Sequence, residues 1–587
     1  MEKNLKNISG ITLVALVITI VILIILAGIS VAGLTNSGIL EKAQKAKKES
    51  NYESNFEKVK LKLYEAQIQC ISDNLEVNLK TIAKKLNNDD EVEYEYLLFD
   101  KQTENNQEDY EQLEVNEADS RIDDAKFILL KLLNIDDVYV IDSKYQVNVK
   151  NANIEARAKV NTKLEHSKLT NTTAYRNKKY TTEIEIDKGE VIDEVVVKMN
   201  GKDITSTSVK GNSINIEKVE ENIEITVSTA WDGTTISTKL DGMGTQEKPY
   251  EINTGADFVY AAQQINDGSS SKINAGDDAM AYNAYYELKN NIKLNKTSNI
   301  QSSENLNNWS PIGTKEKPFQ GTFDGNYKEI QNLYINSTSA QQGLFGFIKD
   351  ATIKKIIIND KSIITTTQGS VGAIAGRADG ETTIDSCGNY GTVTGNNTVG
   401  GICGSASSNN VKIEKCFNKG VITAIKYACG GIIGDNYTSL KYCYSTNKVS
   451  AKGETGAGYT NVGGICGYNS GYVENSYTVS TIYGYSGYGR GMVVGQQFSG
   501  AYTKKSYSLN NQNYSIIGYK KGGSSSECGK FSDETIKSWD QATIEQKLGD
   551  VFCNDEEESE KTNIDGSTTV EYKYNSGYPI LKWEKEK

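Results

Sequence analysis

The nine cysteines carry the most reactive side chains in this chain of 587 residues, and five of them recur at fixed places. Cys387, Cys416 and Cys443 occupy one position of a repeated sequence, and Cys403 and Cys466 occupy another. In stacked parallel strands, equivalent positions lie about 4.8 Å apart. Zinc sites need paired ligands at CxxC-like spacing, which the sequence lacks, and directly stacked neighbours rarely reach disulfide geometry. We therefore expect a buried ladder of small apolar thiols and no metal site, with disulfides between repeats as the alternative.

A single histidine, His166, limits the other kinds of catalytic centre. Every multi-histidine metal site is excluded, and a Ser-His-Asp or Cys-His centre would have to use this one residue. His166 lies among Lys, Thr and Asn, so we expect an exposed residue without chemistry. The 76 acidic side chains outnumber the 64 basic ones, and the net charge is −12. This balance argues against a nucleic-acid partner, whose phosphates need a basic face.

Carboxylates in the repeats could serve polysaccharide cleavage, which needs them clustered with a Lys or Arg base on one face. Asp385, Glu414 and Glu474 share a nearby repeat position, on strands edged by lysine. The remaining acidic residues are scattered, and Arg377 and Arg490 belong to different repeats. No nucleophile–base pair, phosphate loop or HExxH motif occurs. We expect a solvated face here, and a protein that is not an enzyme and has no cofactor.

Tyrosine crowds the outward positions of the later repeats, together with Asn, Ser and Gly. A tyrosine ring offers contact area at small entropic cost, and its hydroxyl adds a hydrogen bond. Two interpretations stay open: a surface that binds glycans or proteins, or a stacked ladder that stabilises exposed strands. The candidate binding residues are Tyr444, Tyr468, Tyr472, Tyr477, Tyr483, Tyr485 and Tyr488.

The elements that must position these side chains form an internal repeat. A GGIxG-type element recurs, and its final glycine falls at residues 346, 376, 404, 434, 467 and 495, so the spacing is 28 to 33 residues. A second strand of its own type follows each element, as in IDSCGNYGTV and IEKCFNKGVI. Short strands with glycine corners, about 30 residues to the turn, predict a parallel β-helix whose stacked coils supply the core.

These repeats resemble the GLUG motif of bacterial surface proteins. The flanks agree: WSPIGTKEKPFQGTFDGNYKEIQNLYI resembles the entry to such β-helices, and YNSGYPILKW at 574–583 resembles their closing segment. The resemblance covers about 340 residues, well over half of the chain. It implies a solenoid fold at 232–535 with a C-terminal cap at 536–587, but no single function, because the motif occurs on adhesins and on accessory parts of proteases alike.

The first 40 residues predict a membrane segment. Residues 11–34 read ITLVALVITIVILIILAGISVAGL, which is 24 uncharged, mostly apolar residues. A helix of about 20 residues spans a bilayer, and a cleavable secretory signal has a shorter apolar core. Lys3 and Lys6 precede the run, so we expect a single-pass cell-membrane protein with its N-terminus inside and its bulk outside. A plain uncleaved anchor is one alternative.

The same segment resembles a type IV prepilin N-terminus, with a short polar leader at 1–10 that ends in Gly10. In that family a membrane peptidase cuts after this glycine and the new N-terminus, here Ile11, is methylated. The family usually has Glu five residues into the mature chain, where this sequence has Ala15. That glutamate is thought to pair with a neighbouring subunit's N-terminus. The departure makes a bulk pilin less fitting than a minor, tip-located or non-assembling pilin-like protein.

A pilin-like body is expected at 41–154. Phe56, Val59, Leu63, Ala66 and Cys70 make an apolar stripe that continues the helix, and Leu79, Ile82, Ala83 and Leu86 mark a second short helix. Residues 138–149 alternate and predict a strand. Residues 89–124 hold 15 acidic and two basic side chains, which predicts a solvated or disordered loop.

An immunoglobulin-like β-sandwich is expected at 155–231, where short alternating strands flank the hairpin signal Asn200-Gly201. This stretch resembles the small spacer modules of Gram-positive surface proteins. The fold class is therefore mainly β: a transmembrane helix at 11–40, a pilin-like body, a small sandwich and a large parallel β-helix.

The predicted function is a non-catalytic cell-surface adhesin or interaction protein, as a minor type IV pilin-like subunit. Its expected partners are the prepilin peptidase, other pilin-like subunits, membrane lipid and an unknown glycan or protein ligand. One alternative is a membrane-tethered β-helix enzyme that acts on carbohydrate. Another is a pseudopilin of a secretion or uptake system, although such proteins are usually far smaller.

Overall fold

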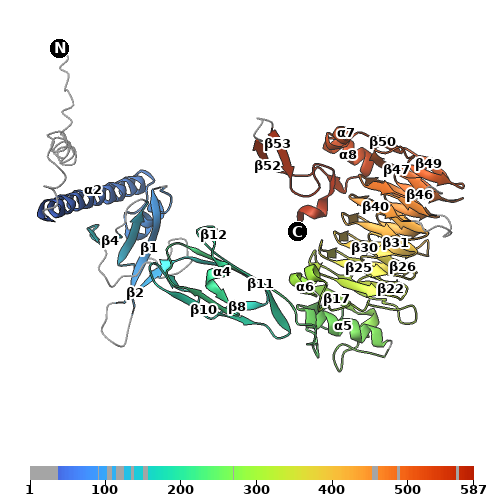
Figure 1. The fold of residues 1–587 in the computed structure, drawn as a ribbon, viewed down its shortest axis with the longest axis horizontal. Helices are drawn as coiled ribbons and strands as arrows, with labels where there is room; N and C mark the ends of the chain where they lie inside the picture. Colours follow the sequence, from blue (N-terminus) through green and yellow to red (C-terminus); the bar gives the residue numbers. More distant parts are fainter. Residues whose placement is uncertain are drawn as a thin grey trace, which may run out of the picture.

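The computed structural model describes residues 37–89, 91–101, 109–113, 125–133, 138–149, 157–268, 270–452, 460–484, 489–562 and 568–586. Four parts follow one another along the chain: a helix with a small sheet, a β-sandwich, a long solenoid and a C-terminal cap (Figure 1). The predicted leader with Gly10, the predicted new N-terminus Ile11 and the apolar run all lie outside the described residues. Within them, no helix is both long and apolar enough to cross a bilayer.

The first part places the long helix α2 (Ser37–Ser72) and the short helix α3 (Leu79–Leu86) against a five-stranded antiparallel sheet in the order β2-β1-β3-β4-β5. The strands are β1 (Val92–Lys101), β2 (Asp109–Leu113), β3 (Phe127–Leu132), β4 (Tyr139–Asp142) and β5 (Val147–Val149). The two predicted stripes face this sheet: Val59, Leu63, Ala66 and Cys70 of α2 and all four α3 residues are buried with Ile128, Leu130 and Tyr139. The helix predictions are confirmed.

Two local predictions for this part were wrong. The acidic stretch at 89–124 contains β1 and β2, which pair with each other and bring β1 against β3. Charge composition hides these strands, because one face of an antiparallel sheet can stay in water. Residues 138–149 form a hairpin of β4 and β5 rather than one strand. Tyr145 takes a left-handed conformation with φ of 61° at the turn, which alternation alone does not reveal.

The sandwich consists of two four-stranded sheets, β13-β14-β10-β8 and β12-β11-β15-β7. Val197, Ile214, Ile223 and Ile225 are buried in the core, as alternation predicted. Asn200 and Gly201 form the turn between β11 and β12, both with positive φ. The bounds are β7 (Val160–Leu164), β8 (Ser167–Leu169), β10 (Tyr180–Ile186), β11 (Glu190–Met199), β12 (Lys202–Asp203), β13 (Val209–Lys210), β14 (Ser213–Ile216) and β15 (Ile223–Trp231). A short helix, α4 (Thr205–Ser208), and the pair β6 (Arg157–Ala158) and β9 (Ala174–Tyr175) complete it.

The solenoid confirms the predicted parallel β-helix. Its longest sheet, here called the long sheet, has 17 strands, and sheets of seven, six and five strands form the other faces. All named pairings between these strands are parallel and join equivalent positions of successive repeats, as in Val371, Val399 and Cys429. The apolar side chains of all faces meet in one continuous core. The helix α5 (Gly255–Asp267) covers the N-terminal end of this core with Phe258 and Ile265, so that edge is not free to pair.

The strand bounds follow by face. The long sheet contains β16 (Tyr250–Ile252), β17 (Tyr285–Leu288), β18 (Ile292–Lys293), β19 (Thr322–Asp324), β20 (Glu329–Gln331), β23 (Thr352–Lys354), β24 (Ile357–Ile358), β28 (Thr383–Asp385), β29 (Gly388–Asn389), β33 (Lys412–Glu414), β34 (Phe417–Asn418), β38 (Ser439–Lys441), β39 (Tyr444–Ser445), β43 (Tyr472–Thr478), β47 (Tyr502–Leu509), β49 (Ser524–Ser526) and β50 (Gly529–Phe531). The seven-stranded sheet contains β22 (Phe345–Lys349), β27 (Ala375–Asp379), β32 (Cys403–Ala406), β37 (Ile433–Asn436), β42 (Cys466–Asn469), β46 (Val494–Gln497) and β48 (Ile517–Lys520). The six-stranded sheet contains β21 (Tyr334–Ser337), β25 (Ile363–Thr366), β30 (Thr392–Gly395), β35 (Ile422–Ala424), β40 (Lys448–Ala451) and β44 (Thr481–Tyr483). The five-stranded sheet contains β26 (Ser370–Gly372), β31 (Thr398–Gly400), β36 (Ala428–Gly430), β41 (Asn461–Gly463) and β45 (Arg490–Gly491).

The paired glycines of the GGIxG element are a requirement of close approach. A Cβ on Gly400 would lie 2.0 Å from the carbonyl oxygen of Cys403, and one on Gly401 would lie 2.1 Å from that of Gly431. Both distances are far inside van der Waals contact, so the corner admits no side chain. Buried amides stabilise other corners, since the Asn389 Nδ2 donates to Asn418 Oδ1 at 2.7 Å and Asn436 Nδ2 donates to Asn469 Oδ1 at 2.9 Å.

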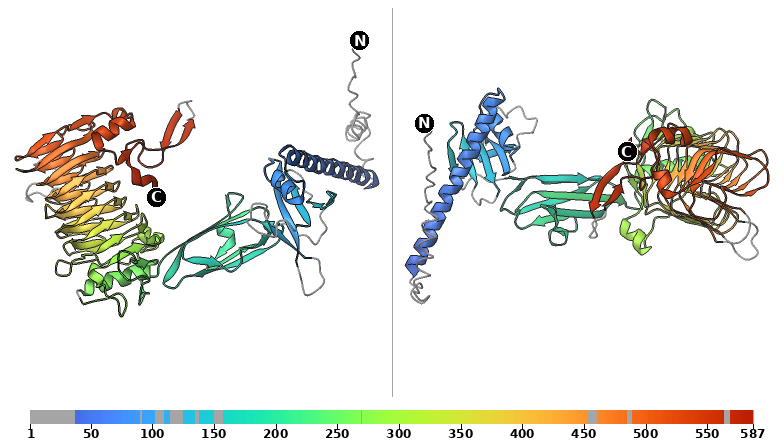
Figure 2. Two further views of the ribbon diagram at one scale, coloured as in Figure 1. Left: turned by 180° about the vertical axis from the view of Figure 1, so that it is seen from behind. Right: turned by 90° about the horizontal axis from the view of Figure 1, so that it is seen from above.

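The C-terminal cap folds back along one side of the long sheet, as the two further views also show (Figure 2). It comprises α7 (Asp533–Lys537), α8 (Gln541–Leu548), β51 (Phe552–Cys553), β54 (Ile580–Leu581), the 3-10 helix η4 (Lys582–Glu586) and the hairpin β52 (Glu557–Thr562) and β53 (Thr568–Tyr572). Trp539, Phe552 and Trp583 of the cap are buried against the solenoid.

Candidate binding site at the junction of sandwich and solenoid

The sandwich and the solenoid meet in a polar contact that fixes how they sit. The Asp193 carboxylate of β11 pairs with the Lys293 ammonium of β18 at 3.0 Å and accepts from the Thr297 backbone N–H at 2.7 Å and its hydroxyl at 2.8 Å. The Asp193 side chain is only 3% exposed. A buried charge is tolerated when it is paired and hydrogen-bonded, as this one is.

A second contact forms between the end of the sandwich and the first solenoid helix. The Gly255 N–H of α5 donates to Glu190 Oε1 at 3.3 Å. Gly255 also packs on Trp231, and a Cβ there would lie 2.4 Å from the Trp231 Cβ. Glycine at this position therefore lets α5 approach the last strand of the sandwich.

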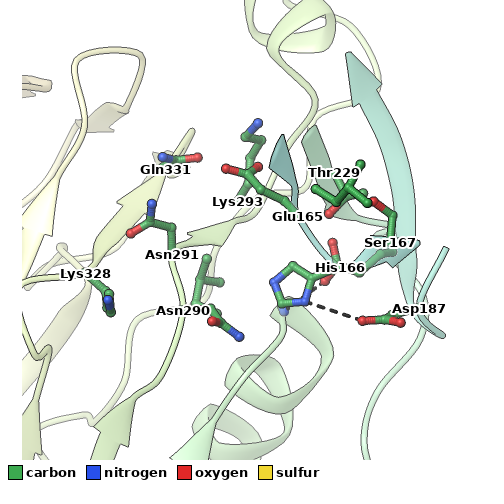
Figure 3. A pocket seen from close by; sticks show the side chains of 14 residues that line it. Glu165, His166, Ser167, Asp187, Thr229, Asn290, Asn291, Lys293, Lys328 and Gln331 are labelled. Atoms are coloured by element: carbon green, nitrogen blue, oxygen red, sulfur yellow. Dashed lines mark hydrogen bonds and ion pairs between the residues drawn. The ribbon is translucent and has the colours of Figure 1, made fainter. Parts of the chain in front are cut away.

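A cavity of about 380 Å³ lies between the two parts, beside these contacts (Figure 3). The sandwich contributes the β7–β8 turn, the start of β11 and the end of β15, and the solenoid contributes strand β18, its preceding turn and β20. The polar side chains that line it are Glu165, His166, Ser167, Asp187, Glu190, Thr229, Asn290, Asn291, Lys293, Lys328 and Gln331. Walls from two domains are a frequent setting for ligand sites.

Among the charged groups that line this cavity, the Glu190 carboxylate is buried, which disfavours its charged form. Glu190 is 8% exposed, and burial raises its pKa, an effect that the neighbouring His166 opposes. His166 Nδ1 lies 3.8 Å from Asp187 Oδ2. Among the described residues, no group of three His, Cys, Asp or Glu side chains is placed to hold a metal ion.

A second cavity of about 380 Å³ adjoins the first, because Lys293 and Gln331 line both. Its other lining residues come from successive coils of the solenoid: Thr297, Glu329, Asn332, Asn359, Asp360, Lys361 and Tyr390. The first cavity therefore lies between the sandwich and the solenoid, and the second is lined by the solenoid alone.

The prediction for His166 was wrong. Its side chain is 15% exposed and lines the junction cavity rather than standing free in water. The sequence around it is polar because the surface it faces is polar. Since the lining comes from residues 164 to 331 on two domains, local sequence offers no signal that joins them.

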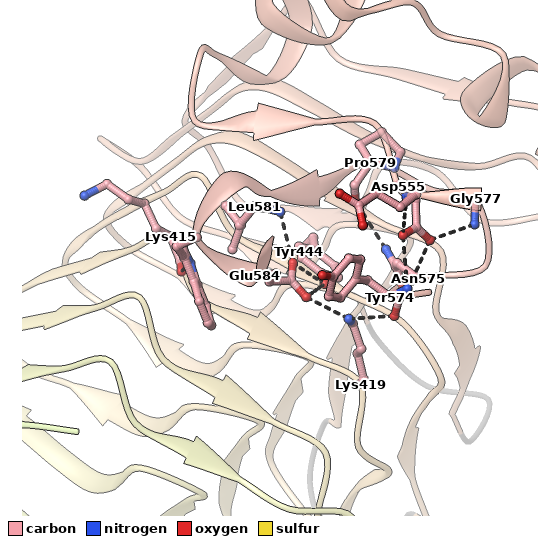
Figure 4. Close-up of polar contacts among 12 residues, drawn as sticks. Lys415, Lys419, Tyr444, Asp555, Tyr574, Asn575, Gly577, Pro579, Leu581 and Glu584 are labelled. Carbon is pink, nitrogen blue, oxygen red and sulfur yellow. Dashed lines mark hydrogen bonds and ion pairs between the residues drawn. The ribbon is translucent and has the colours of Figure 1, made fainter. Parts of the chain in front are cut away.

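The predicted tyrosine surface needs correction at two positions. Tyr444 and Tyr477 are fully buried, because the C-terminal cap covers the outward column that they form with Phe417. Their rings stack at 5.2 Å between centroids, and the Tyr444 hydroxyl donates to Glu584 at 2.8 Å (Figure 4). Burial holds the pKa of Tyr444 well above its usual value.

The remaining candidate tyrosines do not form one patch. Tyr468 lies on the seven-stranded sheet, Tyr472 on the long sheet and Tyr483 on the six-stranded sheet. Tyr472 and Tyr483 are exposed, whereas Tyr468 is half-buried. Tyr485 and Tyr488 lie outside the described residues. Lys448 lies over the Tyr483 ring, with its nitrogen 5.0 Å from the centroid, and Tyr472 packs on Tyr502 at 4.4 Å.

The cysteine columns lie where the repeat places them. Cys387, Cys416 and Cys443 stack in adjacent coils, between the two strands of the long sheet in each coil, and all three are buried. Cys403 and Cys466 share a column but are separated by Ile433, so they are not neighbours. All nine cysteines are free thiols. Burial holds the pKa values of Cys387, Cys443 and Cys466 well above the usual thiol value.

The repeated carboxylates lie in one column of the long sheet that also contains three lysines. Equivalent positions hold Asp324, Lys354, Asp385, Glu414, Lys441, Glu474 and Lys504. Lys354 pairs with Asp324 at 3.0 Å, Lys415 with Asp385 at 3.1 Å and Lys441 with Glu474 at 2.8 Å. Although burial opposes it, hydrogen bonds from Lys441 and Tyr502 keep the pKa of Glu474 below its usual value.

The chain was compared with protein families and with known protein sequences. No family model matches the chain. In sequence it is similar to halomucin of Haloquadratum walsbyi, with 33% identity over 189 residues, which is 31% of this chain and 2% of that protein. The chain therefore spans a very small part of this relative.

Two solved structures are similar at a low level. One is a candidate immunoglobulin A1 protease from Bacteroides ovatus, with a TM-score of 0.42 and 18% identity over 59% of this chain and 96% of the other. Another is an IgA1 protease, with a TM-score of 0.25 and 15% identity over 75% of this chain and 29% of the other. The class of the molecule is thus defined by its own elements: a protein whose largest part is a parallel β-solenoid.

Proposed function

We propose that this chain is a non-catalytic surface adhesin that is anchored, and assembled as a minor pilin-like subunit, through its N-terminal helix. The solenoid then presents its faces outward, at a distance set by the sandwich. Its partners are the prepilin peptidase, other pilin-like subunits, membrane lipid and a glycan or protein ligand. Helix α2 carries this proposal.

Helix α2 has two apolar stripes, and only one of them has a partner within the described chain. Val59, Leu63, Ala66 and Cys70 face the sheet. The second stripe consists of Leu61, Tyr64, Ile68 and Ile71, which are 56% to 65% exposed. Their spacings of 3, 4 and 3 residues are those of a helix–helix seam. Large exposed apolar side chains in a row mark an interaction surface.

The occupant that fits this stripe is the N-terminal helix of another pilin-like subunit. The apolar run at 11–34 precedes α2 in sequence, so a subunit of this kind carries an apolar segment that could pack on the stripe. Knobs at 3-4 spacing pack on a helix rather than on an extended peptide. Helix α2 also lies at the opposite end of the molecule from the solenoid, which leaves the solenoid free for a ligand (Figure 2).

A charge in the stripe tests this assembly. Ile68→Lys should reduce the amount of the protein in sheared surface filaments at least tenfold, because a buried unpaired lysine opposes helix packing. Gln69→Lys puts the same charge on the neighbouring position outside the stripe and should leave the sheared fraction unchanged. Equal loss in both variants, with equal total amounts of folded protein, would contradict the proposed interface.

A second candidate function is carbohydrate cleavage by the solenoid, which the column of carboxylates and lysines favours. Asp385 and Glu414 are direct neighbours in this column. The test is release of reducing ends from soluble polysaccharides by the purified chain, with Asp385→Asn and Glu414→Gln as comparison. Turnover that both variants abolish would support an enzyme; the adhesin proposal predicts no turnover by any of the three proteins.

A further inference from the structure

We propose that the two joined cavities at the junction form one groove that binds a neutral oligosaccharide. This inference deepens the proposed function, since it names the ligand class of an adhesin and rests on that function for its biological sense. The groove is defined here by the residues that line the two cavities.

The size and shape of the groove suit a short chain of sugar units rather than a flat surface contact. Each cavity measures about 380 Å³, and Lys293 and Gln331 line both of them. Small-molecule sites range from roughly 300 to 1,000 Å³. The groove continues from the sandwich across successive coils of the solenoid, ending beside Tyr390.

Side-chain amides and carboxylates make up most of the polar lining of the groove. Side-chain amides come from Asn290, Asn291, Gln331, Asn332 and Asn359, and carboxylates from Glu165, Asp187, Glu190, Glu329 and Asp360. An amide both donates and accepts, and a carboxylate accepts at two oxygens, so each can contact adjacent hydroxyls of a sugar ring. Apolar lining residues are few, which disfavours a lipid tail.

The charges disfavour a polyanion. Five carboxylates face three lysines, Lys293, Lys328 and Lys361. Two of these lysines already form ion pairs within the protein: Lys293 pairs with Asp193 at 3.0 Å, and Lys361 pairs with Asp360 at 2.9 Å. Binding of phosphate or sulfate groups needs several available cations, and the groove does not supply them.

Two hydroxyls that line the groove, Ser167 Oγ and Thr229 Oγ1, are buried without a hydrogen-bond partner among the described residues. The Glu190 carboxylate also lines the groove, is 8% exposed, and accepts a hydrogen bond from the Gly255 backbone N–H at 3.3 Å. Buried polar groups are normally satisfied, so these groups await donors and acceptors of the kind that sugar hydroxyls provide.

The groove is also held rigid before any ligand arrives. Gln331 Nε2 donates to Glu329 Oε2 at 2.9 Å, and Asn291 Oδ1 accepts from the Glu329 N–H at 2.9 Å. The sandwich and the solenoid both line the groove, and the Asp193 carboxylate of the sandwich contacts Lys293 and Thr297 of the solenoid. A ligand therefore pays little ordering entropy on the protein side.

The test is calorimetric titration of the purified full-length chain, kept in a detergent without a sugar headgroup. Maltohexaose, cellohexaose and chitohexaose are the neutral probes; heparin and tetralysine are the charged ones. We expect saturable binding of one of the neutral probes, with a Kd between about 1 μM and 1 mM. Gln331→Leu should weaken it at least tenfold, and Gln246→Leu, an exposed position outside the groove, should not.

Several results would overturn the proposal. They are no binding of any neutral probe at 5 mM, equal binding by Gln331→Leu and the unaltered chain, or binding of heparin or tetralysine alone. Because the titration uses purified protein, it does not depend on assembly into filaments. A chain that binds sugar but never reaches the surface would therefore refute the proposed function without refuting the groove.

Discussion

Asp435 lies in β37 of the seven-stranded sheet, where burial disfavours the charged form of its carboxylate. Burial raises its pKa to about 6, and Arg377, two strands away in register, lowers it only in part. The native state therefore keeps a proton that the unfolded chain releases near pH 4. Stability must fall as the pH rises from about 4 to 6 and then stay level, because the charged form is the one that burial disfavours.

Asp435→Asn removes this penalty. The difference in unfolding free energy between variant and unaltered chain should grow from near zero at pH 4 to as much as about 3 kcal/mol at pH 7, in favour of the variant. Thermal unfolding at several pH values measures it. Glu381→Gln, at an exposed position, is the control and should show no such growth. Parallel pH profiles for Asp435→Asn and the unaltered chain would contradict this reading of the site.

The cysteine ladder allows a second prediction at this scale. Seven thiols are buried, and Cys528 and Cys553 are partly accessible. Iodoacetamide should modify these two first and the other seven only after unfolding, because burial blocks access of the reagent to the other thiols. Peptide mass spectrometry of the native protein reads this out. Rapid native labelling of Cys416, or a melting temperature lowered by reductant, would contradict a ladder of free thiols.

Elements of regular period were predictable from sequence, and elements that depend on distant chain were not. The α2 and α3 stripes, the sandwich strands and the coils all follow from local spacing of apolar residues and glycines. The burial of Tyr444 depends on Glu584, 140 positions later, and the junction groove depends on two domains meeting. Neither leaves a periodic mark in the sequence.

The C-terminal cap is the element whose docking can be tested most simply. Glu584 is fully buried, pairs with Lys419 at 2.8 Å and accepts from Tyr444 and from the Leu581 N–H (Figure 4). Glu584→Gln leaves the Lys419 ammonium buried without its counter-charge, which costs about 3–5 kcal/mol. We expect the cap to open, with a red shift of tryptophan emission from Trp539 and Trp583 and new protease cleavage after residue 531.

Two further variants separate charge from packing at the cap. Combining Glu584→Gln with Lys419→Met removes both charges and should restore most of the protection, because no unpaired charge remains. Glu534→Gln, on the exposed side of α7, should change nothing. If the double variant were as open as Glu584→Gln alone, the ion pair would not be what holds the cap.

At the scale of the whole molecule, the sandwich is a spacer whose angle to the solenoid is set by few contacts. Asp193→Ala removes the partner of Lys293 and of the Thr297 hydroxyl. We expect small-angle X-ray scattering to show a wider range of molecular dimensions, while the solenoid's melting temperature changes little. Glu194→Ala, at the exposed neighbouring position, is the control. An unchanged scattering profile for Asp193→Ala would mean that other contacts fix the angle.

The proposed function requires that the chain assemble at the cell surface through its N-terminal helix and present the solenoid as an adhesin. The most direct measurement is the N-terminal residue of the protein recovered from sheared surface filaments and from membranes, by mass spectrometry. We expect a mature chain in the filaments that begins at methylated Ile11. An intact Met1 confined to the membrane fraction would contradict the proposed function.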